Sequence, residues 1–373
     1  WYCFVSTYFQ NRVRISSFWN LILPCMFRLL NKRFPGQQYP ILLVHAIYLF
    51  ASFALTYVYY HKVISFVDLY KNDYGGVFKV LNIEAISTIQ FRFFIPLLVG
   101  IFSYPLALPP KAVLFVITMG FTYLTIIVFY RTLCFYFENN LFNSLLALLI
   151  LYPLSWNLIA VNNIYFFSDI SSLFFMMLSI YLILTKKFTF LLPAFFLGVT
   201  NHYSIGFIIP AFLLFNYNTI FKVRTISYAG AMVILYAGYY IIARMLLPEL
   251  PPSMDDGFMK VNFHRTMMLL TNTPIHLLIR DILFNFGGIH IFALLFYFSP
   301  VWKKIKRNYT AYNLTIIVFI LLTLTGCGLY SEELRCYITV LPFLMIPAML
   351  FFSQFGGNLM PLNKSILADN IIK

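Results

Sequence analysis

The chain has few charged residues for its length. Asp, Glu, Lys and Arg make up 10% of its 373 residues, whereas soluble domains carry about 25%. Hydrophobic residues reach 61%, and the mean hydropathy is +0.82. This composition excludes a globular enzyme held by a single anchor, and it predicts a polytopic membrane protein.

Motifs that bind metals, phosphates or redox partners are also missing. The five cysteines include no CxxC pair, so neither a zinc site nor a thiol-redox motif is predicted. Cys327 and Cys336 are either two free thiols or a pair bridged across one loop. No GxGxxG or GxxxxGKS/T phosphate loop occurs. Asp255-Asp256 lacks a further ligand at metal-binding spacing, so we predict no metal and no other cofactor.

The charge that is present is mostly positive. Lys and Arg number 26 against 12 Asp and Glu, which gives a net charge of +14. In a membrane protein, such an excess is typical of cytoplasmic loops next to the bilayer. We therefore predict a lipid bilayer as a partner and no nucleic acid.

Eight stretches are long and apolar enough to span a membrane, which takes about 20 residues. They are 41–60, 112–130, 141–159, 165–185, 228–247, 282–300, 311–327 and 337–353. A further apolar stretch, 188–215, is too long for one span and short for two, and the polar run VTNHYS interrupts it. We expect two short helices that break at Asn201-His202 and return to the side from which they started.

Basic residues in short loops indicate which loops face the cytoplasm. Three clusters are placed there: Lys186-Lys187, Lys222 with Arg224, and the KKIKR run at 303–307. The other boundaries follow: the outer loops are 160–168, 248–281 and 328–336, and a short cytoplasmic tail covers 354–373.

The segment 61–111 is expected to form one long external loop. Its run FRFFIPLLVGIFSYPLALPP, at 91–110, contains four prolines and carries Arg92 near its start, which suits a helix lying on the membrane surface. If 91–110 spans the membrane instead, the first helix is inverted.

Acidic side chains in this loop are candidates for acid–base chemistry. Asp68 follows the first span closely, where a carboxylate can accept a proton from a hydroxyl whose lipid tail lies in the membrane. Asp73 follows five residues later. The alternative interpretation is a solvated loop with ordinary charges.

Other polar residues lie beside spans. Asp169 begins a span, where it either stabilises the helix start or lines an outer cavity. His202 at the helix break either donates to a phosphate or shuttles a proton, or else is a packed histidine beside Asn201. Glu332 and Arg335 lie at the outer mouth of the last span. Arg335 can bind a phosphate through two hydrogen bonds. Alternatively, Glu332 and Arg335 form a local salt bridge.

Four of these segments, taken in order, resemble the GT-C superfamily, the polytopic glycosyltransferases that use polyprenyl-phosphate-linked sugars. The first is FVDLYKND after the first span, and the second is the F-R-F-F-I-P-L-L run. The third is YFFSDISSLFF, followed by the broken helix pair GVTNHYSIGFIIP. The fourth is an E-x-x-R element with a downstream proline, formed by Glu332, Arg335 and Pro342.

The resemblance implies an all-α bundle of about 8–11 transmembrane helices, with a large first external loop that carries amphipathic helices. Residues 41–353 would form this GT-C-like domain, after an interfacial or partial membrane segment at 1–40. The resemblance implies that Asp68 is the catalytic base, with Asp73 second. The lipid-phosphate and substrate-binding residues it implies are Arg335, Glu332, Arg92, His202, Asn201 and Asp169.

We therefore expect an integral membrane glycosyltransferase. It would move a sugar from a polyprenyl phosphate to a glycan, lipid or protein acceptor, and membrane-protein partners are possible. The expected location is the bacterial inner membrane, with the active face periplasmic or extracellular. Three alternatives stay open: a secondary transporter, a non-catalytic GT-C-like subunit, and a polymerase of glycan repeats.

Overall fold

The computed structural model describes most of the chain, which divides into two units after Phe50. In the first unit, the described part is the beginning of helix α3 (Gln38–Lys62). The second unit holds every other described element. The described residues are 38–71, 76–85, 90–160, 167–246, 271, 274–276, 285–317, 338–356 and 360–367.

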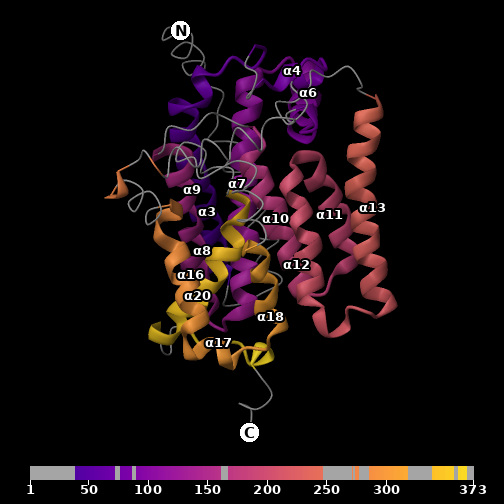
Figure 1. The fold of residues 1–373 in the computed structure, drawn as a ribbon. Coiled ribbons are helices and arrows are strands. Elements are labelled where there is room, and N and C mark those ends of the chain that lie inside the picture. The colour runs from indigo at the N-terminus through magenta and orange to yellow at the C-terminus, as the bar shows by residue number, and fades with distance from the viewer. Residues whose placement is uncertain are drawn as a thin grey trace. The chain divides into compact units, whose positions relative to one another are not determined.

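The regular elements of the described residues are helices, which confirms the predicted all-α class (Figure 1). Besides α3, the second unit contains α4 (Val77–Leu81), α6 (Phe94–Leu106), α7 (Pro110–Tyr136), α8 (Asn140–Ala147), α9 (Leu151–Ser155), α10 (Asp169–Leu184), α11 (Phe188–Asn201), α12 (Ile208–Phe215), α13 (Val223–Leu246), α16 (Ile289–Phe298), α17 (Pro300–Lys304), α18 (Asn308–Ala311) and α20 (Leu341–Gly356).

Five stretches of the described chain are long and apolar enough to cross a membrane. They are Ile41–Phe66, Pro110–Tyr136, Asn140–Ile159, Val223–Met245 and Ile338–Gly356. Shorter apolar helices, among them α6, α10 and α11, accompany them. The chain is therefore a membrane protein, as its composition predicts.

The three basic clusters lie at one end of the second unit. The ring of Phe188, at the start of α11, is 5.1 Å from Phe212 in α12 and 5.6 Å from Tyr228 in α13. Phe215, at the end of α12, is 5.8 Å from Tyr309 in α18. These contacts bring the turns that hold the clusters together. We call this end the basic end and define it by Lys186, Lys187, Lys222, Arg224, Lys303, Lys304, Lys306, Arg307 and Lys364.

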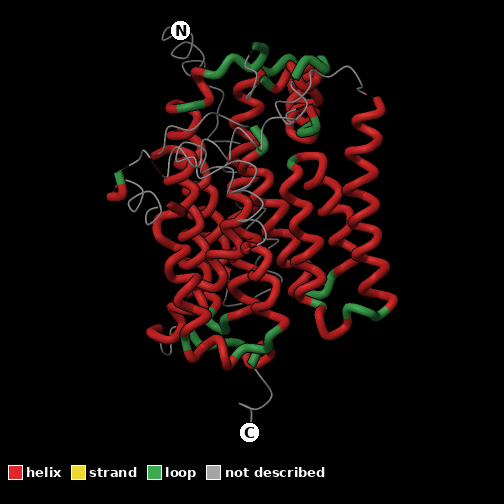
Figure 2. The backbone as a smooth tube through the Cα atoms, in the orientation of Figure 1, coloured by secondary structure: helices red, strands yellow, loops and turns green. Residues whose placement is uncertain are grey.

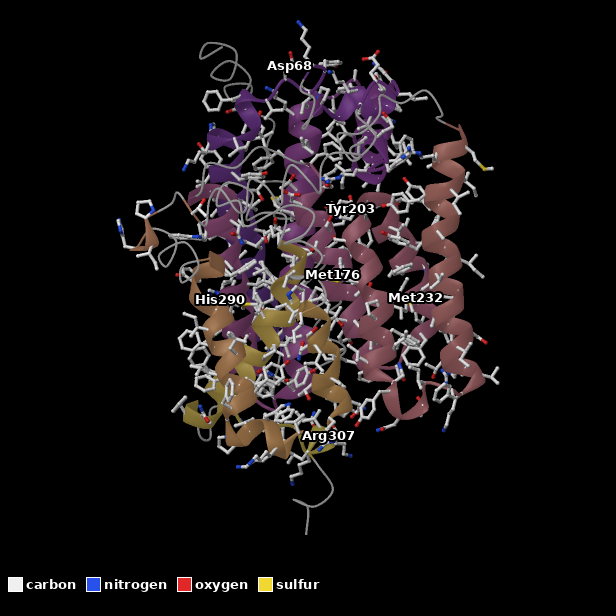
Figure 3. The ribbon with its side chains drawn as sticks, in the orientation of Figure 1. Asp68, Met176, Tyr203, Met232, His290 and Arg307 are labelled. Carbon is white, nitrogen blue, oxygen red and sulfur yellow. The ribbon has the colours of Figure 1, made fainter. Side chains whose placement is uncertain are left out.

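The loop after α3 leaves from the other end and returns to it. The Lys111 ammonium, at the start of α7, donates to the carbonyl of Ser65 at 2.7 Å. Between them, α6 has 13 residues and is therefore about 20 Å long, shorter than the hydrocarbon core of about 30 Å. Figure 3 places Asp68 of this loop and Arg307 of the basic end at opposite ends of the second unit. Most loop segments also lie at these two ends (Figure 2).

The predicted break in the stretch 188–215 is confirmed. Helix α11 ends at Asn201, and His202 is extended at φ −161° and ψ 135°. A 3₁₀ turn over Tyr203–Phe207 then leads into α12. Because the start of α11 contacts the end of α12, the pair returns to the end where it began.

Two segments show detail that the sequence did not predict. The stretch 141–159 is not one continuous α-helix: 3₁₀ and π turns separate and follow α8 and α9, and Pro153 cannot donate the usual backbone bond there. The tail also packs on the bundle. Phe137 pairs with Leu362 and Ile305 with Leu367, so the described part of the tail lies along the basic end.

Candidate functional site

Buried polar side chains gather where α10 begins, where α11 ends, and just before α6. Arg92, Ser168, Asp169, Asn201 and His202 form this polar cluster, and none of them is more than 8% exposed. Four of the five are predicted site residues from three distant segments of the chain. Burial of so many polar groups is favourable only when they are hydrogen-bonded to one another or to nearby groups.

Asn201 fastens the end of α11 to the start of α10. Its amide nitrogen donates to the Ser168 carbonyl at 3.1 Å and to the Ser172 hydroxyl at 2.8 Å. Its amide oxygen accepts from the Ser171 hydroxyl at 3.0 Å. This amide therefore uses both of its ends to hold two helices together, and the role it plays here is structural.

Arg92 reaches the same helix start from the segment before α6. Its guanidinium donates to the hydroxyl of Ser168 at 3.2 Å. Its Cζ lies 5.8 Å from the centre of the Tyr203 ring, which is within cation–π range. The cation thus lies between the start of α10 and the first residue after the helix break.

The neighbours of Arg92 in sequence hold it in place. The Gln90 amide donates to the Val80 carbonyl at 2.7 Å and accepts from the Ala85 backbone at 3.1 Å. The Tyr239 hydroxyl of α13 donates to the Phe91 carbonyl at 2.8 Å. Arg92 therefore directly follows a short segment that is bonded both to the region of α4 and to α13.

The tautomer of His202 follows from its bonds. Its Nδ1 accepts from the backbone N–H of Ser204 at 3.1 Å and lies 2.8 Å from the Ser204 hydroxyl. Because a backbone N–H can only donate, the neutral ring carries its proton on Nε2. The ring stacks on Tyr203, with centroids 4.4 Å apart. His202 is thus oriented to donate through Nε2.

Asp169 is the first residue of α10, and Ser168 occupies the N-cap position. The Ser168 side chain makes no capping bond to the helix. A carboxylate in the first turn interacts favourably with the positive end of the helix dipole. This placement suits the helix-start role of Asp169, and it also puts a negative group inside the polar cluster.

Asp68 lies outside the cluster. Its side chain is exposed, and its Oδ1 accepts the backbone N–H groups of Tyr70 at 2.9 Å and Lys71 at 3.3 Å. This is an Asx turn, a local role that the sequence alone did not reveal. The turn is joined to α4, because the ring of Tyr70 stacks on Phe78 at 4.3 Å.

Three predicted site residues, Asp73, Glu332 and Arg335, lie outside the described residues. Within the described part of the chain, no group of three or more His, Cys, Asp or Glu side chains could hold a metal ion. Within the polar cluster, the Arg92 guanidinium and the His202 imidazole are hydrogen-bond donors beside the start of α10. Such donors suit an anion such as a phosphate group.

Sequence reasoning missed the serine and tyrosine members of this region. Ser168, Ser171 and Ser172 bond Asn201, and Tyr239 of α13 bonds the Phe91 carbonyl next to Arg92. The run SDISS at the head of an apolar helix was the available signal, since serines are uncommon in lipid-facing positions. Nothing in the sequence marked the tyrosines of α13.

Comparison with known proteins identified no relative of this chain. Neither the protein-family models, nor the curated proteins, nor the solved structures that were searched contain a match to this chain.

Proposed function

We propose that the protein is an integral membrane glycosyltransferase. It would move a sugar from a polyprenyl-phosphate donor to a glycan, lipid or protein acceptor at the non-cytoplasmic face. The observation that carries the proposal is the convergence of Arg92, Asp169, Asn201 and His202 in one polar cluster. They come from separate segments of the GT-C-like pattern.

The position of the cluster supports a lipid-linked anion as the ligand. Tyr203, which contacts Arg92 and His202 of the cluster, lies between Asp68 at one end and Arg307 of the basic end (Figure 3). A buried guanidinium can bind a phosphate through two parallel hydrogen bonds. The apolar helices around it would solvate a prenyl chain. One amphiphile could therefore place its phosphate at Arg92 and its tail between helices.

In this proposal, Asp68 deprotonates the acceptor hydroxyl. Oδ1 holds the Asx turn, so Oδ2 is the oxygen that takes the proton. The acceptor oxygen then forms a bond to the anomeric carbon as the bond from that carbon to the phosphate oxygen breaks. Arg92 stabilises the charge of the departing polyprenyl phosphate. A single displacement of this kind inverts the configuration at the anomeric carbon.

Two substitutions of Asp68 separate its possible roles. Asp68→Asn keeps an oxygen that can accept the two backbone bonds, but it removes the proton acceptor. Asp68→Ala removes both. The assay is sugar transfer from a panel of polyprenyl-phosphate sugars by the purified chain in proteoliposomes. A catalytic base predicts loss of at least about 100-fold in both variants, with unchanged folding in Asp68→Asn.

A non-catalytic membrane subunit is the second candidate, and the Asx turn favours it. The carboxylate of Asp68 already has a sufficient structural reason to be present. This alternative predicts no transfer from any donor in the panel. It also predicts that Asp68→Asn preserves thermal stability whereas Asp68→Ala lowers it.

A further inference from the structure

The basic end differs in charge from the rest of the second unit. The described residues at this end include nine Lys and Arg side chains and one acidic side chain, that of Glu138, whose N–H donates to the Pro361 carbonyl. All nine except Lys306 are exposed. The backbone keeps these groups close: the N–H of Lys306 donates to the Ile366 carbonyl at 2.9 Å, which ties the tail and its Lys364 to this loop.

Exposed apolar side chains alternate with these cations. Phe221, beside Lys222, is 90% exposed, and Phe298, shortly before Lys303, is 87% exposed. The other members of this set are Phe190, Val223 and Trp302. Large apolar groups at such exposure are unfavourable in bulk water but are typical of the membrane–water interface. The cations are therefore expected to lie at the depth of lipid headgroups.

Lys186 occupies a backbone position that usually belongs to glycine. Its φ is +56°, in the left-handed region. The N–H groups of Lys186 and Lys187 close α10 by donating to Ile183 at 3.0 Å and Leu182 at 2.9 Å. This arrangement is the helix-ending motif in which glycine is the common residue. A lysine there retains a positive charge at a strained backbone position.

From these three observations we infer that the basic end binds anionic phospholipid headgroups in the leaflet that it faces. The ammonium and guanidinium groups attract the phosphate and the net negative charge, while the neighbouring aromatic side chains insert beside the acyl chains. A soluble polyanion would match the charges but not the exposed Phe221 and Phe298. The inference does not depend on the proposed enzymatic activity, because the polar cluster lies elsewhere in the second unit.

Trp302 provides an internal reporter. It is partly exposed and directly precedes Lys303 and Lys304. The chain has four tryptophans, so replacing Trp1, Trp19 and Trp156 by Phe leaves one fluorophore at the basic end. This variant would be reconstituted in phosphatidylcholine vesicles that contain either dibrominated phosphatidylglycerol or dibrominated phosphatidylcholine. Bromine quenches tryptophan only in contact, so the ratio of quenching gives the local preference for the anionic lipid.

We expect a preference for phosphatidylglycerol of about fivefold at low salt, as for one basic side chain near an anionic surface. The preference should fall below about twofold in the Lys303→Gln/Lys304→Gln double variant, and it should also fall as ionic strength rises. Lys71→Gln, at the opposite end, is the matched control and should leave the preference unchanged. Equal quenching by both lipids at low salt would overturn the inference, as would a preference that the double variant retains.

A second measurement tests the same inference without the single-tryptophan variant, in case that variant does not fold. Native mass spectrometry of the chain with all four tryptophans, released from mixed-lipid nanodiscs, counts the retained phosphatidylglycerol. The double variant should retain fewer of these lipids than the unsubstituted chain or the Lys71→Gln control. Equal retention in all three proteins would contradict the inference.

Discussion

Replacing Asn201 by alanine should destabilise the bundle at one defined joint. The Asn201 amide makes three hydrogen bonds, two from its nitrogen and one to its oxygen, and all three reach the start of α10. Asn201→Ala removes all three without altering the sequence of α10. The helix break at His202 should then lose its fixed position relative to Ser168.

The expected magnitude follows from the partners. The Ser171 and Ser172 hydroxyls also donate to the Ser168 carbonyl, at 3.0 and 2.6 Å, so no partner is left without a bond. The extra cost of an orphaned buried group therefore does not apply. Side-chain hydrogen bonds in membrane proteins contribute about 0.6 kcal/mol on average, so three of them amount to about 2 kcal/mol.

The assay is the free energy of unfolding in lipid bicelles, measured by steric trapping. Thr200→Ala is the matched control, because the Thr200 hydroxyl bonds the Leu197 carbonyl of its own helix. The control should change stability by less than about 0.5 kcal/mol. If Asn201→Ala also stays within that limit, the joint between α10 and α11 does not depend on this amide, and the reasoning is refuted.

Four further substitutions test packing, backbone strain and hydrogen bonding with the same unfolding assay. Gly198→Ala should lower the free energy of unfolding by about 1 kcal/mol, because the added Cβ would lie 3.0 Å from the Phe175 Cβ and overpacking outweighs the gain in helix propensity. Gly238→Ala, with no atom within 4 Å of its added Cβ, should instead raise it by up to about 1 kcal/mol; equal effects would contradict the packing argument. Lys186→Gly should raise it by about 1 kcal/mol by relieving the left-handed strain, and no gain would show that the position is unstrained. Tyr136→Phe should lower it by about 1 kcal/mol, because the lost hydroxyl bonds the carbonyl of one tyrosine and the hydroxyl of another; an unchanged value would show that these bonds contribute nothing.

Composition and periodic apolar runs were enough to predict the class of this fold. Length and hydropathy identified long helices, and the polar run around Asn201-His202 correctly located a break between two short helices. Basic clusters, read as loop markers, also come together at one end. These features are local in sequence, so the sequence carries a direct signal for each of them.

The long-range contacts of the candidate site and of the tail have no such signal. The bond from Tyr239 to Phe91 joins residues 148 positions apart. The partners of the Gln90 side chain are the backbone groups of Val80 and Ala85, which do not depend on residue type. The tail pairs with Phe137 and Ile305 through the backbone, which any residue type could do. For Asp68 the signal was present but pointed elsewhere. Its charge suggested a catalytic base, whereas the structure shows its carboxylate holding a turn.

Binding of a polyprenyl phosphate at the polar cluster is the most direct test of the central claim. The measurement compares the affinity of the purified chain for polyprenyl phosphate and for the uncharged polyprenol of the same length. The account predicts that the phosphate binds more tightly, and that Arg92→Gln reduces this preference by about tenfold or more, as loss of a charge-assisted hydrogen bond implies. Arg244→Gln, an exposed arginine near the end of α13, should leave the preference intact. Equal affinity for the two lipids, or a preference that survives in a folded Arg92→Gln variant, would contradict the account.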